Sequence, residues 1–237
     1  MKRAIVTYAA GAHEELLDVS LPTYKDFAHR HGYDVVVGSK LTDMPPAWNK
    51  IPLLMEALGL YDDVVWFDCD LVVVNPYDDF PPMTGLHAMV RHFEDNSEVP
   101  NSGVWRIRQS SGGIMNGESS GGLSAAGLLR GILALEVFHN HGWWEQAALM
   151  TLMGYTVPPE GSLFPDTRCR NVAKTKWFNS CQFMRLSWNS HPMYRSGSPR
   201  IVHCSYPCMT QRLEVMRELV KDPHYDYPKY LTPSKEV

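Results

Sequence analysis

Short apolar runs alternate with amphipathic segments through the first 75 residues. Residues 3–8, 33–37 and 63–67 are rich in β-branched and aromatic side chains, which is typical of buried strands. Residues 20–31 and 49–58, which lie between these runs, carry apolar side chains at helical spacing. This order predicts an α/β fold with a mostly parallel sheet and helices on both faces. Because ligands bind outside the carboxyl ends of the strands in such sheets, polar residues that follow these runs are candidates for a binding site.

The remainder of the chain is less regular. We expect strands at 86–90, 102–107, 183–186 and 200–205, and helices at 125–140, 144–153 and 210–220. Residues 110–124 are rich in Gly and Ser and predict a flexible loop, either a lid over a ligand or a plain surface loop. The sequence has no internal repeat and no clear linker. We therefore expect one domain, residues 1–221, followed by a C-terminal tail at 222–237.

Charge and cysteine content exclude several classes of protein. The net charge of −4 does not favour binding to nucleic-acid phosphates. No apolar run approaches the roughly 20 residues that span a bilayer, and no signal peptide is seen, so we expect a cytoplasmic protein with peripheral membrane association left open. The five cysteines are odd in number and widely spaced, which is a poor disulfide framework. A bond between Cys204 and Cys208 remains an alternative.

Two carboxylates, Asp68 and Asp70, follow the apolar run at 63–67. Side chains two residues apart on an extended chain point to the same side, so these carboxylates can share a divalent cation. The alternative is a turn in which they accept hydrogen bonds from backbone N–H groups. His203 follows another apolar run and would add an imidazole nitrogen, although a lone histidine of this kind is more often a core residue. A mixed oxygen and nitrogen set suits Mn²⁺, with Mg²⁺ as a substitute.

Several short blocks in order along the chain carry a resemblance. They are 24–33 (YKDFAHRHGY), 48–52 (WNKIP), 66–70 (WFDCD), 75–76 (NP), 101–104 (NSGV), 144–149 (WEQAAL), 178–180 (FNS) and 202–203 (VH). Together they resemble glycosyltransferase family 34, whose members are α-galactosyl-, α-mannosyl- and α-xylosyltransferases. The resemblance implies a Rossmann-like GT-A fold in a single domain, a nucleotide-diphosphate sugar as donor, Mn²⁺, and transfer with retention of anomeric configuration.

The resemblance also implies roles for individual residues. Asp68, Asp70 and His203 match the metal ligands of the family. The donor-binding candidates are Tyr8, Ala9, Lys50, Asp68, Cys69, Asp70, Asn101 and Gly103. Glu145 and Gln146 match a pair that faces the donor sugar, and they are the catalytic candidates. We favour a front-face reaction, in which Gln146 stabilises the oxocarbenium-like sugar and the leaving phosphate takes the proton of the acceptor. A covalent intermediate is the alternative.

The expected function is therefore a Mn²⁺-dependent retaining glycosyltransferase. It would move a hexose or pentose from a UDP-sugar, or from GDP-mannose, to a hydroxyl of a glycan, glycolipid or other glycoconjugate. One alternative is a non-catalytic protein that binds nucleotide-sugars on the same scaffold. Another is a sugar nucleotidyltransferase, but such enzymes usually carry a basic Gly-rich loop after the first strand. Residues 9–13, which are AAGAH, contain no Lys or Arg.

Overall fold

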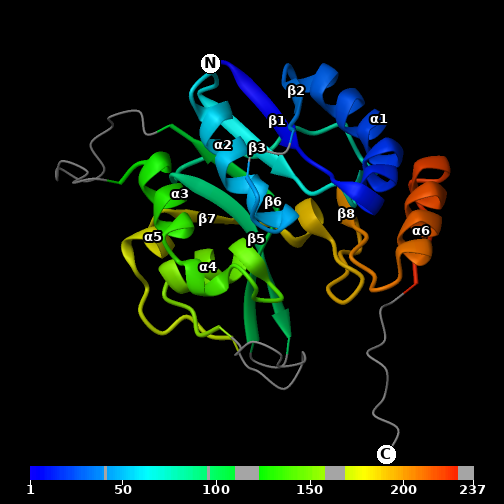
Figure 1. Cartoon of the computed structure of the whole chain (residues 1–237). Coiled ribbons are helices and arrows are strands. Elements are labelled where there is room, and N and C mark those ends of the chain that lie inside the picture. The colour runs from blue at the N-terminus through cyan, green and yellow to red at the C-terminus, as the bar shows by residue number, and fades with distance from the viewer. Residues whose placement is uncertain (40–41, 95–96, 110–122, 158–168, 229–237) are drawn as a thin grey trace, which may run out of the picture.

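A six-stranded sheet lies at the centre of the computed structural model, which describes residues 1–39, 42–94, 97–109, 123–157 and 169–228 (Figure 1). The strands lie in the order β2-β1-β3-β6-β5-β7. All of them run in one direction except β6, which is antiparallel to both of its neighbours. Their bounds are β1 Arg3–Thr7, β2 Asp34–Val37, β3 Asp63–Phe67, β5 His87–Glu94, β6 Ser97–Arg108 and β7 Cys181–Met184. The predicted α/β fold with a mostly parallel sheet is confirmed.

Helices cover both faces of this sheet (Figure 1). Alternate strand residues face the two helical layers, as the period of two in a strand requires. Ile5 and Val65 pack in the same cluster as residues of α1, whereas Ala4 and Val64 pack in the same cluster as residues of α2, α3 and α4. The last helix, α6, packs mainly on α1. The helices are α1 Glu14–His31, α2 Lys50–Leu58, α3 Ala125–Leu133, α4 Trp144–Leu152, α5 Lys176–Asn179 and α6 Met209–Lys221.

A second, two-stranded sheet joins distant parts of the chain. It pairs β4 (Leu71–Val73) with β8 (Ile201–His203) in antiparallel register, with Leu71 opposite His203. The backbone N–H of Cys204 donates a hydrogen bond of 2.8 Å to the carbonyl of Asp70. The register of this small sheet therefore brings His203 beside the residue that precedes β4.

Several predicted element bounds are wrong. Helix α1 begins at Glu14 instead of residue 20, and it continues through Pro22, which lies on its exposed side. The helix expected at 125–140 ends at Leu133, and a separate 3₁₀ turn follows at Glu136–Phe138. Strand β6 begins before residue 102, in a stretch with Glu98, Pro100 and Asn101, which are residue types that strands usually disfavour.

The remaining predictions concern the loop, the tail and the cysteines. Residues 110–122 of the predicted Gly/Ser loop, and residues 229–237 of the predicted tail, lie outside the described residues. The first part of the tail packs on the domain, because the hydroxyl of buried Tyr227 lies 2.8 Å from Oγ of Ser190. All five cysteines are free thiols, so Cys204 and Cys208 do not form a disulfide. In the described part of the chain, no helix has the length and apolar character needed to cross a membrane.

Candidate active site

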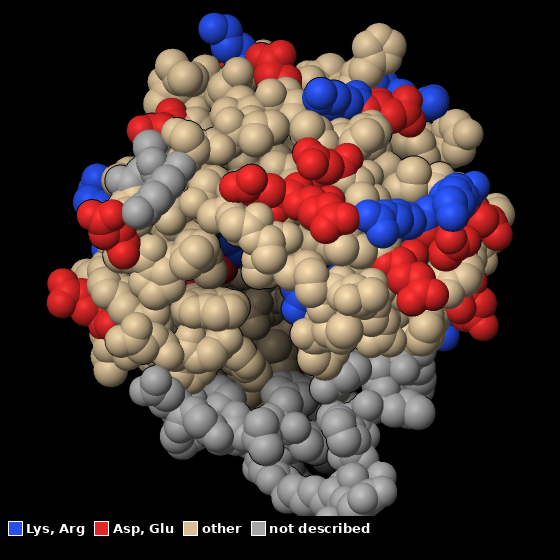
Figure 2. Space-filling model, turned by 45° about the vertical axis from the view of Figure 1, so that its right-hand side comes forward, with Lys and Arg blue, Asp and Glu red and all other residues tan. Residues whose placement is uncertain are grey.

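A cavity of about 690 Å³ opens at the carboxyl ends of β1 and β3. The space-filling view shows a hollow in this face of the molecule, bordered mainly by residues that carry no charge (Figure 2). Ten of the residues predicted for the site line the cavity: Tyr8, Ala9, Lys50, Asp68, Cys69, Asp70, Asn101, Glu145, Gln146 and His203. The fold thus brings together side chains from the two ends of the chain at the sheet edge where α/β proteins bind ligands.

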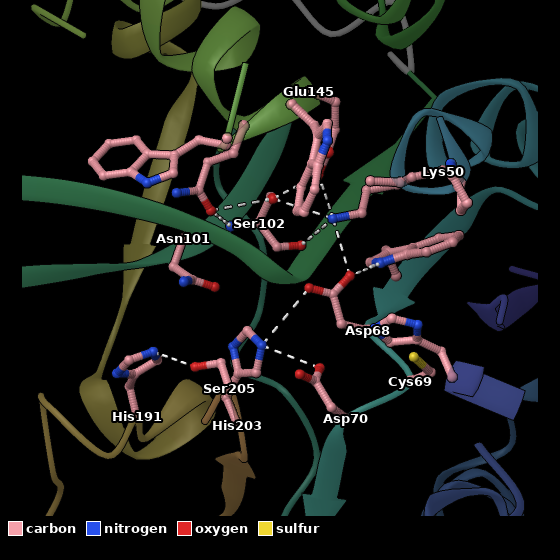
Figure 3. A pocket seen from close by; sticks show the side chains of 18 of the residues that line it. Lys50, Asp68, Cys69, Asp70, Asn101, Ser102, Glu145, His191, His203 and Ser205 are labelled. Atoms are coloured by element: carbon pink, nitrogen blue, oxygen red, sulfur yellow. Dashed lines mark hydrogen bonds and ion pairs between the residues drawn. The ribbon is translucent and has the colours of Figure 1, made fainter. Parts of the chain in front are cut away.

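Asp68, Asp70 and His203 converge at the centre of this cavity (Figure 3). Nε2 of His203 lies 3.2 Å from Oδ1 of Asp70 and 3.9 Å from Oδ2 of Asp68. One ligand atom from each of the three side chains lies within 4.8 Å of the other two. Two carboxylate oxygens and an imidazole nitrogen form a donor set that suits Mn²⁺ and, less readily, Mg²⁺.

Each carboxylate uses its other oxygen to bind a protein cation. Oδ1 of Asp68 lies 3.0 Å from Nζ of Lys50, and Oδ2 of Asp70 accepts a 3.0 Å hydrogen bond from Arg212. Burial alone would raise the pKa of Asp70, but the facing His203 imidazole and the Arg212 guanidinium hold that pKa well below its usual range. Asp70 therefore stays ionised, and each carboxylate turns one oxygen toward the point at which a cation can bridge all three side chains.

Gly103 makes room for the imidazole of His203. The β3–β6 register places the end of β3 beside Gly103, whose carbonyl accepts a 2.9 Å hydrogen bond from the backbone N–H of Asp68. A Cβ atom at position 103 would lie 2.6 Å from Cε1 and 2.7 Å from Nδ1 of His203, closer than real contacts allow. The sequence predicted that Gly103 approaches the donor, but the residue lies behind His203 and does not line the cavity.

Lys50 does not point freely into the cavity, as a residue that awaits a diphosphate would. Its ammonium is enclosed by four oxygens, namely Oε1 of Glu145 at 2.5 Å, Oδ1 of Asp68 at 3.0 Å, and Oγ and the carbonyl of Ser102 at 3.2 and 3.4 Å. Burial alone would lower the pKa of Lys50, but Asp68 and Glu145 outweigh it and raise that pKa. The permanent charge of Lys50 therefore links Asp68 to the start of α4 (Figure 3).

Ser102 also fixes the side chain of Gln146. Oε1 of Gln146 accepts a 3.0 Å hydrogen bond from the backbone N–H of Ser102. Oδ1 of Asn101 accepts hydrogen bonds from the backbone N–H of Gly103, at 2.8 Å, and from Nδ2 of Asn189, at 2.7 Å. The side-chain oxygens of Gln146 and Asn101 thus already accept hydrogen bonds from the protein. Their amide N–H groups are therefore the groups that can contact a ligand in the cavity.

Sequence reasoning missed several residues of the site. Ser102 lay inside a recognised block, but its role as the centre of a hydrogen-bond network depends on Lys50 and Glu145, which are distant in sequence. Arg212 follows β8 at the start of α6, and no motif distinguished it from other surface arginines. The sequence pattern does not predict the contacts of Ser102 and Arg212, because all of them depend on how separate elements pack.

Comparisons with known proteins support the fold but give no relative by sequence. No family model matches the chain, and no curated protein sequence matches it. A glycosyltransferase involved in glycosylation of the major capsid of PBCV-1 aligns with a TM-score of 0.63 at 13% identity, covering 92% of this chain and 100% of that one. The galactosyltransferase LgtC, in complex with donor and acceptor sugar analogues, aligns with a TM-score of 0.54 at 11% identity, covering 92% of this chain and 95% of that one. The glycosyltransferase GlyE of Streptococcus pneumoniae aligns with a TM-score of 0.51 at 12% identity, covering 98% of this chain and 67% of that one.

The architecture of the chain is therefore that of a GT-A glycosyltransferase, in one domain. At these levels of identity the likeness concerns the fold. The function must therefore be inferred from the residues in the cavity.

Proposed function

We propose that this protein is a Mn²⁺-dependent glycosyltransferase that acts with retention and is related to glycosyltransferase family 34. It moves a hexose or pentose from a nucleotide-diphosphate sugar, with a UDP-sugar as the favoured donor and GDP-mannose as the second, to a hydroxyl of a glycan, glycolipid or other glycoconjugate. The observation that carries the proposal is the convergence of Asp68, Asp70 and His203 in the cavity of a GT-A fold. The family relationship and the retention are supported by the sequence blocks alone.

The residues present fit a divalent cation. Each of the two carboxylates has one oxygen held by a protein cation and the other turned toward Nε2 of His203. Asp68, Asp70 and His203 would hold the ion, and Mn²⁺ in this place would neutralise the charge of the diphosphate leaving group. Arg212 lines the same cavity beside Asp70 and adds a second positive charge on this side.

In the reaction, the bond between the anomeric carbon and the diphosphate oxygen breaks, and the acceptor oxygen forms a bond to the same carbon. The acceptor proton passes to the leaving diphosphate. Gln146, which is held by Ser102, directs its side-chain amide toward the sugar as positive charge develops there. Tyr8 and Ala9, at the end of β1, contact the nucleoside.

Glu145 has a positioning role in this mechanism. Its carboxylate is buried and bound to Lys50 at 2.5 Å and to Oγ of Ser102 at 3.0 Å. A carboxylate held in this way is a poor nucleophile, because attack on the sugar would take from the buried ammonium of Lys50 one of its two carboxylate partners. This arrangement supports the front-face reaction over a covalent intermediate on Glu145. A cytoplasmic location, with peripheral membrane association open, stays a prediction from the sequence.

The test is calorimetric binding of UDP and of GDP to the purified protein with and without Mn²⁺. We expect one nucleotide to bind and its affinity to require Mn²⁺. The Asp70→Ala variant should lose the Mn²⁺ dependence, whereas Asp26→Ala, which removes an exposed carboxylate on α1, should not. Folded wild-type protein that binds neither nucleotide would contradict the proposal.

Product analysis separates the two alternatives. A nucleotide-sugar-binding protein would bind the donor but release no sugar to an acceptor or to water. A sugar nucleotidyltransferase would consume a nucleoside triphosphate and a sugar 1-phosphate. We expect the wild-type protein to release nucleoside diphosphate from the donor, and to do so more slowly after Gln146→Ala.

A further inference from the structure

The indole of Trp144 lies at the wall of the cavity without a partner of its own. Trp144 is 44% exposed although it lines the cavity. In the described part of the chain, no aromatic ring, cation or hydrogen-bonding side chain pairs with this indole. Large aromatic surfaces that remain exposed beside a cavity mark places where ligands bind.

The backbone at Trp144 is held in a conformation that non-glycine residues rarely adopt. Its φ angle is +42°, in the left-handed region. The N–H of Trp144 donates a 2.9 Å hydrogen bond to the carbonyl of His141, and the next two side chains are bound to Lys50 and to Ser102. Strain of this kind persists only where the surroundings impose it, and it concentrates at ligand sites. The same contacts that fix Glu145 and Gln146 therefore also fix the backbone from which the indole projects.

Trp144 lies next to the residues that are proposed to act on the donor sugar. It directly precedes Glu145 and Gln146, and Gln146 is the residue assigned to the donor sugar. A second substrate that receives the sugar must enter the cavity next to that residue. The face of an indole carries negative charge density, which attracts the polarised C–H groups on one face of a pyranose ring.

We propose that Trp144 is the platform on which a pyranose ring of the acceptor stacks. The acceptor is then a carbohydrate, recognised through its C–H face and not through charge. This inference rests on the proposed transferase function and names the chemical class of its second substrate. The other planar group that enters the cavity is the base of the donor, so the test must separate the acceptor from the nucleotide.

The experiment uses variants of one side chain and a set of simple sugars. Trp144→Asn removes the ring and suits a left-handed backbone, because Asn adopts that region more readily than most residues. Trp144→Phe keeps an aromatic face. Tyr77→Asn is the matched control, since Tyr77 is 74% exposed and lies outside this cavity. The probes are the methyl β-pyranosides of galactose, glucose and xylose and methyl α-mannoside, observed by saturation-transfer NMR with and without UDP and Mn²⁺.

We expect at least one pyranoside to receive saturation at its ring C–H protons from the wild-type protein. The dissociation constant of that sugar should rise roughly tenfold in Trp144→Asn, change little in Trp144→Phe, and stay unchanged in Tyr77→Asn. UDP affinity with Mn²⁺ should be equal in all four proteins.

Three results would overturn the inference: no contact between wild-type protein and any of the four sugars, a sugar affinity that is unchanged in Trp144→Asn, or a loss of UDP affinity in Trp144→Asn that shows stacking of the base. Failure of the proposed function gives a different result. In that case wild-type protein binds neither UDP nor GDP, while sugar contact at Trp144 is still judged from the samples without nucleotide.

Discussion

Oε1 of Glu145 lies 2.5 Å from Nζ of Lys50, and the two side chains are only 4% and 5% exposed. They come from α4 and α2, 95 residues apart in the sequence. The pair extends to Asp68 and so couples the start of α4 to the candidate metal centre. The sequence predicted Glu145 as a catalytic carboxylate, and in the structure this carboxylate is held by the buried ammonium of Lys50.

Lys50→Met should destabilise the fold strongly. It leaves the carboxylates of Glu145 and Asp68 without their ammonium, and breaking a buried pair in this way costs about 3–5 kcal/mol. Adding Glu145→Gln to Lys50→Met should recover part of the loss, with a coupling free energy of roughly 1–3 kcal/mol. Urea unfolding of the two single variants and the double variant measures this coupling. Strictly additive free energies would show that the pair does not act as a unit.

Gln146→Ala should lower turnover and leave donor binding intact. In the proposed mechanism the amide of Gln146 stabilises charge that exists only in the transition state, so its loss should reduce kcat by roughly 10²-fold. The KM for the donor should change by less than threefold. Glu145→Gln keeps the hydrogen bond to Ser102 and should retain more activity than Gln146→Ala. Steady-state rates of nucleoside diphosphate release compare the two variants. A lower rate in Glu145→Gln than in Gln146→Ala would indicate that Glu145 is the catalytic residue.

Gly103→Ala should weaken metal binding without unfolding the protein. The new Cβ would meet His203 at 2.6 Å and push its imidazole away from the two carboxylates. Disturbing the orientation of a ligand typically costs 10–100-fold in metal affinity. Gly197→Ala is the control, because no atom lies within 4 Å of a Cβ at that position. Titration of Mn²⁺ followed by electron paramagnetic resonance gives both affinities, and equal values would contradict the role of Gly103.

Acid should destabilise the fold through buried His87. Nδ1 of its ring accepts a hydrogen bond from Trp105, at 3.2 Å, and Nε2 donates to the carbonyl of Trp177, at 3.0 Å, so the neutral ring is fully bonded. Burial lowers the pKa of His87 to about 4, against 6.5 for an exposed ring. Between these values the unfolded chain takes up a proton that the folded protein does not, so the free energy of unfolding falls as the pH falls.

The loss of unfolding free energy caused by His87 should reach about 3 kcal/mol at pH 4 and vanish above pH 7. Urea unfolding at a series of pH values measures it against His87→Asn, which keeps an acceptor for Trp105 and cannot be protonated. The pH dependence of the variant should be shallower but not flat, because burial also lowers the pKa of His92 to about 4. Identical slopes for wild type and variant would contradict the assignment.

The sequence predicted those parts of the site that depend on local pattern. The apolar run before Asp68 and Asp70 indicated both the strand and the sheet edge at which it ends, because strand periodicity and parallel topology act over short distances. His203 was predicted from the resemblance alone. Its actual placement depends on the register between β4 and β8, which the sequence of either strand does not specify.

The parts that the sequence did not predict depend on tertiary contacts. The sequence predicts Lys50 as a donor-binding residue, and its enclosure by Glu145 and Asp68 becomes visible only when the separate elements are packed together. Gly103 reads as a glycine for close approach to a ligand until the ring of His203 is seen against it. Helix α1 also begins earlier than its pattern suggests, because the packing of Leu16 and Leu17 supports its first turns.

The pairing of β4 with β8 has a consequence for how the protein is made. Asp68 and Asp70 leave the ribosome well before His203 does, and the ligand set is incomplete until β8 has docked. A nascent chain therefore has all three candidate ligands in place only after β8 has been synthesised and has paired with β4. The entropic cost of closing the long loop between β4 and β8 grows only slowly with its length, so late closure adds little to the free energy of folding. Completion of the candidate metal site is then a late step of folding, in which β8 is joined to β4.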